Sequence, residues 1–444
     1  MSKTEGIAII SSQDIPASFY GSGRLSSKEL SDTVRSVLTE VKEKGDTALH
    51  QYAQKFDKAD PTTFEISQEA MKMAAEKMQQ EKPDLYEALC YSRDMALQFA
   101  KKQRECFMDF ETELAEGVFT GQKNIPVEKA GVYVPGGLFP LLSSVIMGTM
   151  PAKAANVQEI ILCSPPKLHP TDPYLPWVDE GIMAAAFICG VDHLYACGGS
   201  QAIAAMAFGT ESIPKVDVIV GPGNRFVSEA KKLVYGEVGI DMLAGPTEVF
   251  IIADDSANPE WVAADLLAQA EHAFDSQAIL ATDSIDLAQK VQAAVKEQLS
   301  TLPTQETAQS SIEKYSCIIV CKNLTEAAEI ANKKMPEHLE LAMDKGVHRD
   351  TIEQLVHNYG SLFIGHESAE VFGDYAAGLN HTLPTAGSAR FTGGLSVRHF
   401  IKTVTTLRVE DNSLGMQKIA KSANELGLKE GLEAHAAAAR FRFK

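Results

Sequence analysis

The sequence predicts an α/β protein built on two parallel β-sheets. Three strand–turn–helix units follow one another between residues 130 and 235, and the turn in each of them is rich in glycine. Strand-like and helix-like segments alternate again between residues 249 and 334. Such alternation is typical of parallel sheets covered by helices. At 444 residues the chain is long enough to form more than one hydrophobic core.

The composition is ordinary for a globular protein, with 45% hydrophobic and 23% charged residues. A net charge of −18 argues against binding to nucleic acid or to an anionic membrane, which favour basic surfaces. We find neither a signal-peptide pattern at the N-terminus nor an apolar run long enough to span a membrane. The seven cysteines are scattered and form no Cys-x-x-Cys pair, so we expect free thiols in a reducing cytoplasm.

The segments before the first glycine turn are predicted to be mainly helical. Residues 1–25 show no sustained periodicity and are expected to form an arm. A helix should run from a cap at Ser26 or Ser27 to Lys44, where Gly45 ends it.

The next segments predict further helices and then strands. Residues 67–105 predict two helices that are separated near Pro83, and residues 107–121 predict strand structure with a turn at Gly117.

The three glycine-rich turns are candidate ligand-binding loops. They begin after Val134, Cys197 and Val220 and contain Pro-Gly-Gly, Gly-Gly-Ser-Gln and Gly-Pro-Gly-Asn, the first of them ending at Gly137. Ligands of parallel sheets bind beyond the carboxyl ends of the strands, where such turns lie. The dinucleotide fingerprint Gly-x-Gly-x-x-Gly is absent, so ordinary tight turns are an alternative. Polar or aromatic side chains beside the three turns favour a ligand: Tyr133, Gln201 and Asn224.

A helix that ends near Gln269 carries two polar side chains where the pattern calls for apolar ones. Asn258 is a suitable N-cap and Pro259 suits the first helical position. Gln269 falls on the apolar stripe of this helix, and His272 projects from the same face. A hydrogen-bonded network at a helix end is one interpretation, and half of a metal site is the other, because His is a frequent zinc ligand.

Two later segments and the C-terminus carry further candidates. Glu337 and His338 follow Pro336 at a predicted helix-to-strand junction, where a carboxylate and an imidazole could act as an acid–base pair or could form a chance surface turn. Residues 370–385 are expected to form a polar loop that gathers several potential ligands. Two helices are predicted after residue 413, the last of which carries His435 beside four alanines.

Taken together, these stretches resemble the histidinol dehydrogenase family. The resemblance extends from about Val127 to Arg440 and rests on eight motifs that keep the family's order. The motifs are Tyr133-Val-Pro-Gly-Gly, Gly221-Pro-Gly-Asn, Gly245-Pro-Thr-Glu, Gln269-Ala-Glu-His, Pro336-Glu-His-Leu, Gly373-Asp-Tyr, Asn380-His-Thr-Leu-Pro-Thr and Glu430-Gly-Leu-Glu-Ala-His.

The resemblance implies a fold of two incomplete Rossmann-like parallel-sheet domains with small N- and C-terminal dimerisation segments. The first α/β domain would combine residues 26–130 and 250–395 and carry the metal and catalytic residues. The second, NAD-binding domain would be residues 131–249. Residues 1–25 would be the arm, and residues 396–444 a helical dimerisation segment of a homodimer with shared active sites.

The resemblance also implies a zinc- and NAD-dependent oxidation of a primary alcohol to a carboxylate in two hydride transfers, within histidine biosynthesis. His338 would be the general base, and Glu337 would activate water for the second step. The zinc ligands, one ion per subunit, would be Gln269, His272, Asp374 and His435, the last from the partner subunit. Tyr133, Gln201 and Asn224 would contact NAD. Substrate would be contacted by Ser143, Thr247, Gln269, His272, His338, Glu370, Asp374, His381, Glu430 and His435.

Two alternatives stay open at this stage. Members of the family oxidise other alcohols, including 2,3-dihydroxypropane-1-sulfonate, and Thr247 together with the segments at residues 121–127 and 392–397 leans toward that branch. Glu370 favours histidinol, because a carboxylate suits a cationic amine and repels a sulfonate. A non-catalytic zinc-binding homodimer is the third reading, and retention of both Glu337 and His338 argues against it.

Overall fold

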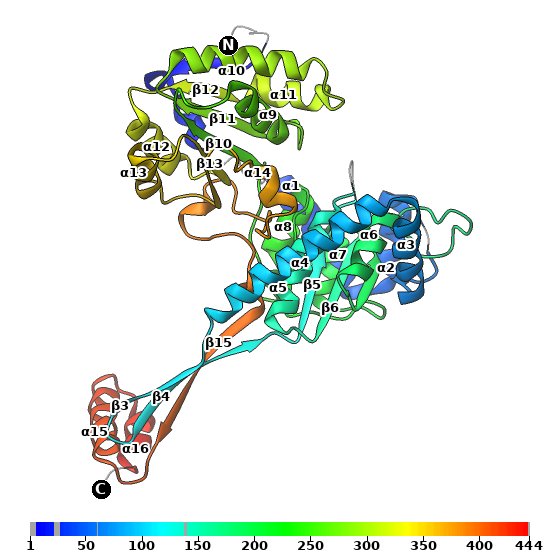
Figure 1. The fold of residues 1–444 in the computed structure, drawn as a ribbon. Coiled ribbons are helices and arrows are strands. Elements are labelled where there is room, and N and C mark those ends of the chain that lie inside the picture. The colour runs from blue at the N-terminus through cyan, green and yellow to red at the C-terminus, as the bar shows by residue number, and fades with distance from the viewer. Residues whose placement is uncertain (1–5, 22–26, 60, 137–139, 443–444) are drawn as a thin grey trace.

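The computed structural model describes residues 6–21, 27–59, 61–136 and 140–442, so Ser26 and Gly137 of the sequence analysis lie outside the described residues. Two α/β bodies lie side by side, and a long antiparallel ribbon extends from one of them to a small helical unit at the C-terminus (Figure 1). The expected pair of parallel sheets is therefore confirmed, and each sheet has six strands.

The first sheet is parallel throughout. Its strands, in spatial order, are β1 (Ala8–Ser11), β12 (Cys317–Val320), β11 (Gln277–Thr282), β10 (Glu248–Ala253), β13 (His338–Ala342) and β14 (Ser361–Ile364). The central strands β10 and β13 are buried along their whole length, as expected for a sheet that is covered on both faces.

Helices cover both faces of this first sheet, and apolar side chains from each set form a separate core. One face carries α9 (Pro259–Ala270), α10 (Ile285–Leu299) and α11 (Gln305–Tyr315). The other face carries α12 (Leu324–Lys334) and α13 (Val347–Leu355).

The second sheet is parallel except at one edge. Its spatial order is β2 (Glu65–Ile66), β7 (His193–Ala196), β6 (Glu159–Ser164), β5 (Lys129–Tyr133), β8 (Val218–Val220) and β9 (Gly239–Ile240), with β2 antiparallel to β7. The three strand–turn–helix units of the sequence analysis supply β5, β7 and β8.

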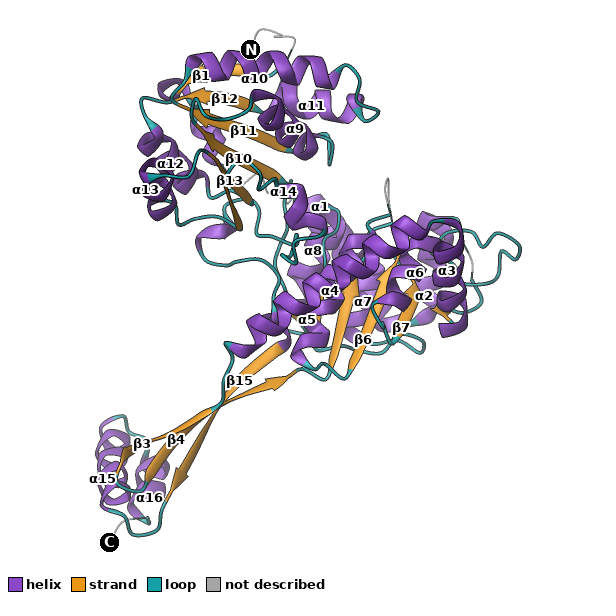
Figure 2. Ribbon diagram, viewed as in Figure 1, coloured by secondary structure: helices purple, strands orange, loops and turns teal. Residues whose placement is uncertain are grey.

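Helices also cover both faces of the second sheet (Figure 2). One face carries α1 (Lys28–Lys44), α2 (Asp46–Tyr52), α7 (Gly199–Phe208) and α8 (Arg225–Val234). The other carries α3 (Gln68–Glu81), α4 (Pro83–Glu105), α5 (Leu142–Ala155) and α6 (Glu180–Ile188).

The packing of the N-terminal segments differs from the expected domain assignment. Residues 28–105, expected to belong to the first α/β domain, pack on the second sheet through the apolar stripes of α1 to α4. The expected arm at residues 1–25 contributes β1, which pairs with β12 at the edge of the first sheet. Amphipathic periodicity fixes which face of a helix is buried, but it does not specify which of two sheets receives that face.

A three-stranded antiparallel ribbon and two helices form the distal unit. The ribbon consists of β3 (Phe110–Ala115), β4 (Val118–Pro126) and β15 (Ile401–Val409), in the spatial order β15-β4-β3. The helices are α15 (Leu414–Lys429) and α16 (Glu433–Arg440). The expected turn at Gly117 and both expected C-terminal helices are confirmed. The segment at residues 396–444, expected to be helical, also contains the strand β15 before these helices. In the described part of the chain, every helix is too short or too polar to cross a membrane.

Candidate active site

A cleft of about 180 Å³ lies between the two sheets. Its walls combine residues from the second sheet with residues from the first sheet. Pro222 and Gly223 come from the turn after β8 of the second sheet, whereas Thr247, Glu337 and His338 precede or begin strands of the first sheet. The cleft therefore joins the carboxyl ends of strands in one sheet to the amino ends of strands in the other.

The register of β10 and β13 brings Glu337 and His338 together with Thr247 and Glu248. Val249 lies opposite His338 in this parallel pair, so the residues just before each strand are neighbours. The Thr247 hydroxyl and the Glu248 N–H, the latter at 3.0 Å, both donate to Oε2 of Glu337. Nδ1 of His338 lies 3.3 Å from the carbonyl oxygen of Glu248. Glu337 and His338 are thus buried and fixed by contacts with Thr247 and Glu248, and they do not form a surface turn.

Gln269 occupies the end of α9 as the sequence predicts. Its side chain is buried, and its Nε2 donates to the Thr247 hydroxyl at 2.8 Å. Its Oε1 is buried without a hydrogen-bond partner, which is costly for an amide oxygen unless a ligand completes the site. His272 follows the helix, is exposed and lines the cleft.

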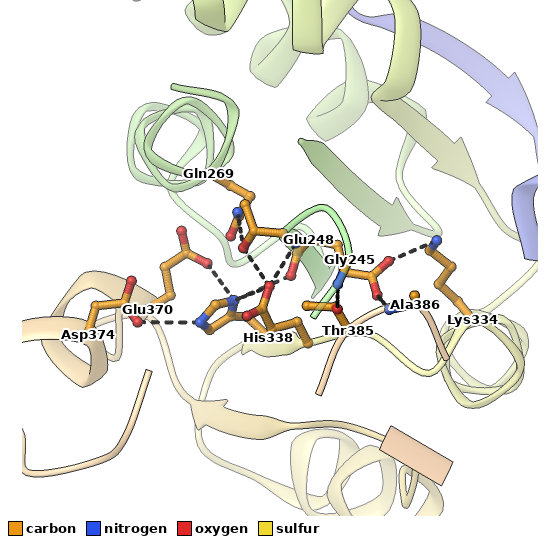
Figure 3. Close-up of polar contacts among 11 residues, drawn as sticks. Gly245, Glu248, Gln269, Lys334, His338, Glu370, Asp374, Thr385 and Ala386 are labelled. Carbon is orange, nitrogen blue, oxygen red and sulfur yellow. Dashed lines mark hydrogen bonds and ion pairs between the residues drawn. The ribbon is translucent and has the colours of Figure 1, made fainter. Parts of the chain in front are cut away.

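The segment at residues 370–385, expected to be a loop, begins with the short helix α14 (Glu370–Tyr375). Glu370 and Asp374 are four residues apart on this helix and therefore project from one face. Oδ1 of Asp374 lies 3.4 Å from Nε2 of His338, and Oε2 of Glu370 lies 3.8 Å from Nδ1 of His338 (Figure 3). Asp374 lines the cleft, whereas Glu370 is only 1% exposed and lies behind the imidazole.

Negative charge is in excess around the imidazole of His338. Burial disfavours the charged imidazole, but the carboxylates of Glu337, Asp374 and Glu370 outweigh burial and raise its pKa to about 10. Burial raises the pKa of Glu337 to about 7, against the opposing effects of His338 and of the Thr247 and Glu248 donors. Burial likewise raises the pKa of Glu370 to about 8. A cation in the cleft would relieve this excess of carboxylates.

Ser143 and His381 lie together on another wall of the cleft. Ser143 is in the first turn of α5, and its Oγ is 3.1 Å from Nε2 of His381. Burial lowers the pKa of His381, which favours the neutral imidazole. The structure thus gathers nine of the predicted residues in or directly beside the cleft: Ser143, Thr247, Gln269, His272, Glu337, His338, Glu370, Asp374 and His381.

The three predicted cofactor-binding residues border the turns of the second sheet. Tyr133 ends β5, and its buried hydroxyl accepts a hydrogen bond from the Gly199 N–H at 3.1 Å. Gln201 is buried in the first turn of α7, and Asn224 caps α8 through its Oδ1. Gly221 has φ +117°, and a Cβ there would collide with the carbonyl oxygen of Tyr133, so this turn requires glycine.

Glu430 and His435 lie outside the cleft of their own chain. Glu430 follows α15 and His435 is on α16, and both are exposed. These two helices lie at the far end of the ribbon (Figure 1). In the described residues no three His, Cys, Asp or Glu side chains are gathered as a metal site. One chain thus brings together Gln269, His272 and Asp374, but not the fourth predicted ligand.

Comparisons with known proteins find relatives that match nearly the whole chain. The family model described as histidinol dehydrogenase matches residues 22–443. The histidinol dehydrogenase of Streptococcus mutans is 43% identical over 410 residues, which is 92% of each chain. That of Thermus thermophilus is 42% identical over 431 residues, covering 96% of this chain and 98% of its own. A crystal structure of histidinol dehydrogenase from Elizabethkingia anophelis covers 99% of this chain and 98% of its own, with TM-score 0.89 and 36% identity.

The chain belongs to the histidinol dehydrogenase family. It is accordingly an NAD-dependent oxidoreductase, and membership of this family implies both NAD and zinc. Residues in and beside the cleft fit a zinc ion, because the unpartnered amide oxygen of Gln269, the imidazole of His272 and the carboxylate of Asp374 are all zinc donors.

Sequence reasoning missed one part of the site, the buried pair of Lys334 and Glu248. Nζ of Lys334 lies 2.9 Å from Oε2 of Glu248, and both residues adjoin the histidinol dehydrogenase motifs Gly245-Pro-Thr-Glu248 and Pro336-Glu-His-Leu. A lysine at the end of a helix usually points to solvent, so the position of Lys334 gives no sign of burial in the sequence. The signal that the sequence does offer is Glu248, the acidic residue that ends the first of these motifs.

Replacement of Thr247 tests the hydrogen bonds that converge on Glu337. In Thr247→Val, Glu337 loses a donor and Nε2 of Gln269 loses its acceptor while both stay buried. Each lost bond to a buried partner costs about 1–3 kcal/mol, so we expect kcat for NADH formation to fall roughly 10–100-fold. Thr247→Ser keeps the hydroxyl and is the matched control, which should retain most of the activity. Equal activity of the two variants would contradict this role of the hydroxyl.

Proposed function

We propose that the protein oxidises L-histidinol to L-histidine through the aldehyde, with transfer of two hydrides to two molecules of NAD, as a step of histidine biosynthesis. Membership of the family supports this proposal, and the observation that carries it is the Glu337–His338 pair held at the cleft between the two sheets. A structural zinc protein would need neither a buried imidazole nor a buried carboxylate in that position.

His338 is proposed as the general base that removes the hydroxyl proton of the alcohol. It lines the cleft and is only 3% exposed, and its Nδ1 lies beside the Glu248 carbonyl, which leaves Nε2 to take the proton. The surrounding carboxylates raise the pKa of this imidazole to about 10, and a cation bound in the cleft would offset them, lower the pKa and so free His338 to act as a base. Glu337 is proposed to activate the water that attacks the aldehyde before the second hydride transfer. Its pKa of about 7 suits a group that takes up and releases a proton near neutral pH.

The proposed zinc site combines Gln269, His272 and Asp374 of one chain with His435 of a second copy, one ion per subunit. When bound, zinc would supply a Lewis acid that holds and orients the alcohol. Within the chain, Thr247 orients the amide of Gln269, and the start of α14 places the Asp374 carboxylate beside His338. Ser143, His381 and Glu370 are proposed substrate contacts, as is Glu430 from the second copy.

The proposed homodimer is supported by the surface of the distal unit. This unit buries few apolar side chains, and large apolar residues remain exposed on it: Leu114, Leu407, Leu414, Leu426 and Phe441. Exposed apolar surface of this kind marks sites of association. A second copy that covers it could bring its own α16, with His435, to the cleft, and each subunit would then complete the site of the other.

NAD is proposed to bind at the turns of the second sheet, beside Tyr133, Gln201 and Asn224. These turns lie at the carboxyl ends of β5, β7 and β8, which is where parallel sheets bind ligands. The Gly221 turn also lines the cleft through Pro222 and Gly223, so a cofactor held there would reach the alcohol.

We also propose that the protein works in a reducing cytoplasm. All seven cysteines are free, which supports this location.

A panel of alcohols tests the substrate. We expect purified zinc-loaded protein to form NADH with L-histidinol, and to lose this activity with a chelator and regain it with zinc. 2,3-Dihydroxypropane-1-sulfonate and simple amino alcohols are the comparison substrates, and their kcat/KM should be lower by roughly 100-fold or more, as expected when site polar groups are left unpaired. Activity confined to another alcohol would reject histidinol and keep the reaction type.

Subunit mixing tests the shared site. His338→Asn and His435→Ala should each be inactive as homodimers. In a mixed dimer, one of the two sites receives an intact His338 from one chain and an intact His435 from the other. Random mixing should therefore restore about a quarter of the wild-type activity. Mixing His338→Asn with Glu337→Gln is the control, because both changes lie in the same half of the site and no intact site can form. No recovery in the first mixture would contradict the shared site.

A further inference from the structure

The buried pair of Lys334 and Glu248 lies directly behind the candidate active site. Lys334 is the last residue of α12 and Glu248 the first residue of β10, and they are 5% and 3% exposed. Neither residue lines the cleft. Burial of a lysine and a glutamate together carries a large desolvation cost, which the attraction between them often fails to offset. A pair in this position therefore calls for a role other than stability.

The main chain of Glu248 contacts both members of the proposed acid–base pair. Its N–H donates to Oε2 of Glu337 at 3.0 Å, and its carbonyl oxygen lies 3.3 Å from Nδ1 of His338. The orientation of the peptide groups on either side of Glu248 thus decides where the carboxylate and the imidazole point. A rotation of this residue would disturb both groups at once.

The side chain of Glu248 is held at both oxygens. Oε2 pairs with Nζ of Lys334 at 2.9 Å, and Oε1 accepts from the N–H of Ala386 at 3.2 Å. Lys334 in turn donates to Oε1 of Gln277, the first residue of β11, at 2.7 Å. The pair therefore ties α12, β10, β11 and the segment at Ala386 to one point. Figure 3 shows the contacts of Glu248 with Lys334 and with Ala386.

We propose that Lys334 and Glu248 are positioning residues for the oxidation: the buried ion pair fixes the first residue of β10 so that its main chain holds Glu337 and His338 in their reactive orientation. The inference rests on the proposed function. Displacement of a reacting group by about 1 Å can cost roughly 100-fold in rate, so a pair that never touches substrate can still set kcat.

The kinetic signature of Lys334→Met separates positioning from folding. We expect kcat to fall about 10–100-fold, because Glu337 and His338 lose their alignment. KM for the alcohol and for NAD should change less than about threefold, and the zinc content should stay at the wild-type value, since neither residue lines the cleft. Glu248→Gln keeps an acceptor for the N–H of Ala386, so its kcat should fall less than that of Lys334→Met. If Lys334→Met fails to fold, Glu248→Gln provides the test in its place.

The double variant Lys334→Met/Glu248→Gln tests whether the two residues act as a unit. Its kcat should be no lower than that of Lys334→Met alone, because the contact that positions Glu248 is already lost. Losses that multiply would contradict the proposal.

Lys231→Met is the matched control for loss of a buried lysine. Lys231 is 3% exposed, pairs with Asp241 and donates to the carbonyl oxygen of Gly221 at 2.9 Å, in the turn beside the proposed NAD site. Its loss should raise KM for NAD. If Lys231→Met instead lowers kcat alone, as Lys334→Met is expected to do, then the loss of any buried charge has this effect and the proposal fails.

An inactive wild-type protein would overturn the proposed function, whereas an active wild type with unchanged kcat in Lys334→Met would overturn only this inference.

Discussion

The parallel register of β10 and β13 is the constraint on which the site depends. Val249 lies opposite His338, so Thr247 and Glu248, at the start of β10, adjoin Glu337 and His338, at the start of β13. Side chains alternate between the two faces of a strand, and a slip of one residue would turn His338 to the other face of the sheet. The bonds from Thr247 and Glu248 to Glu337, and the contact of His338 with the Glu248 carbonyl, all follow from this register.

The two sheets contribute opposite strand ends to the cleft. The second sheet offers the carboxyl ends of its strands, where glycine turns such as that at Gly221 allow close approach of a ligand. The first sheet offers amino ends, where Thr247 and Glu337 lie. A cofactor can therefore be bound by one sheet while the acid–base chemistry is performed from the other.

Local patterns predicted those parts of the fold that local interactions determine. The glycine turns, the helix that buries Gln269 and the helix–strand junction at His338 were all found from spacing and capping residues. The sheet that α1 to α4 cover was assigned wrongly, because their apolar stripes fit either sheet. The sequence predicts a loop where α14 lies, because Gly373 is a poor helix former, and the structure continues the helix through this glycine. The Lys334–Glu248 pair joins residues far apart in the chain and left no local pattern.

The count of NADH per molecule of substrate tests the central claim most directly. With L-histidinol limiting and NAD in excess, the reaction should run to completion with about two NADH per histidinol, because one site performs both the alcohol and the aldehyde oxidation. Histidine should appear in equal amount to the histidinol consumed. A yield of about one NADH, with aldehyde released, would contradict the account, because it would leave no role for Glu337 in the second step.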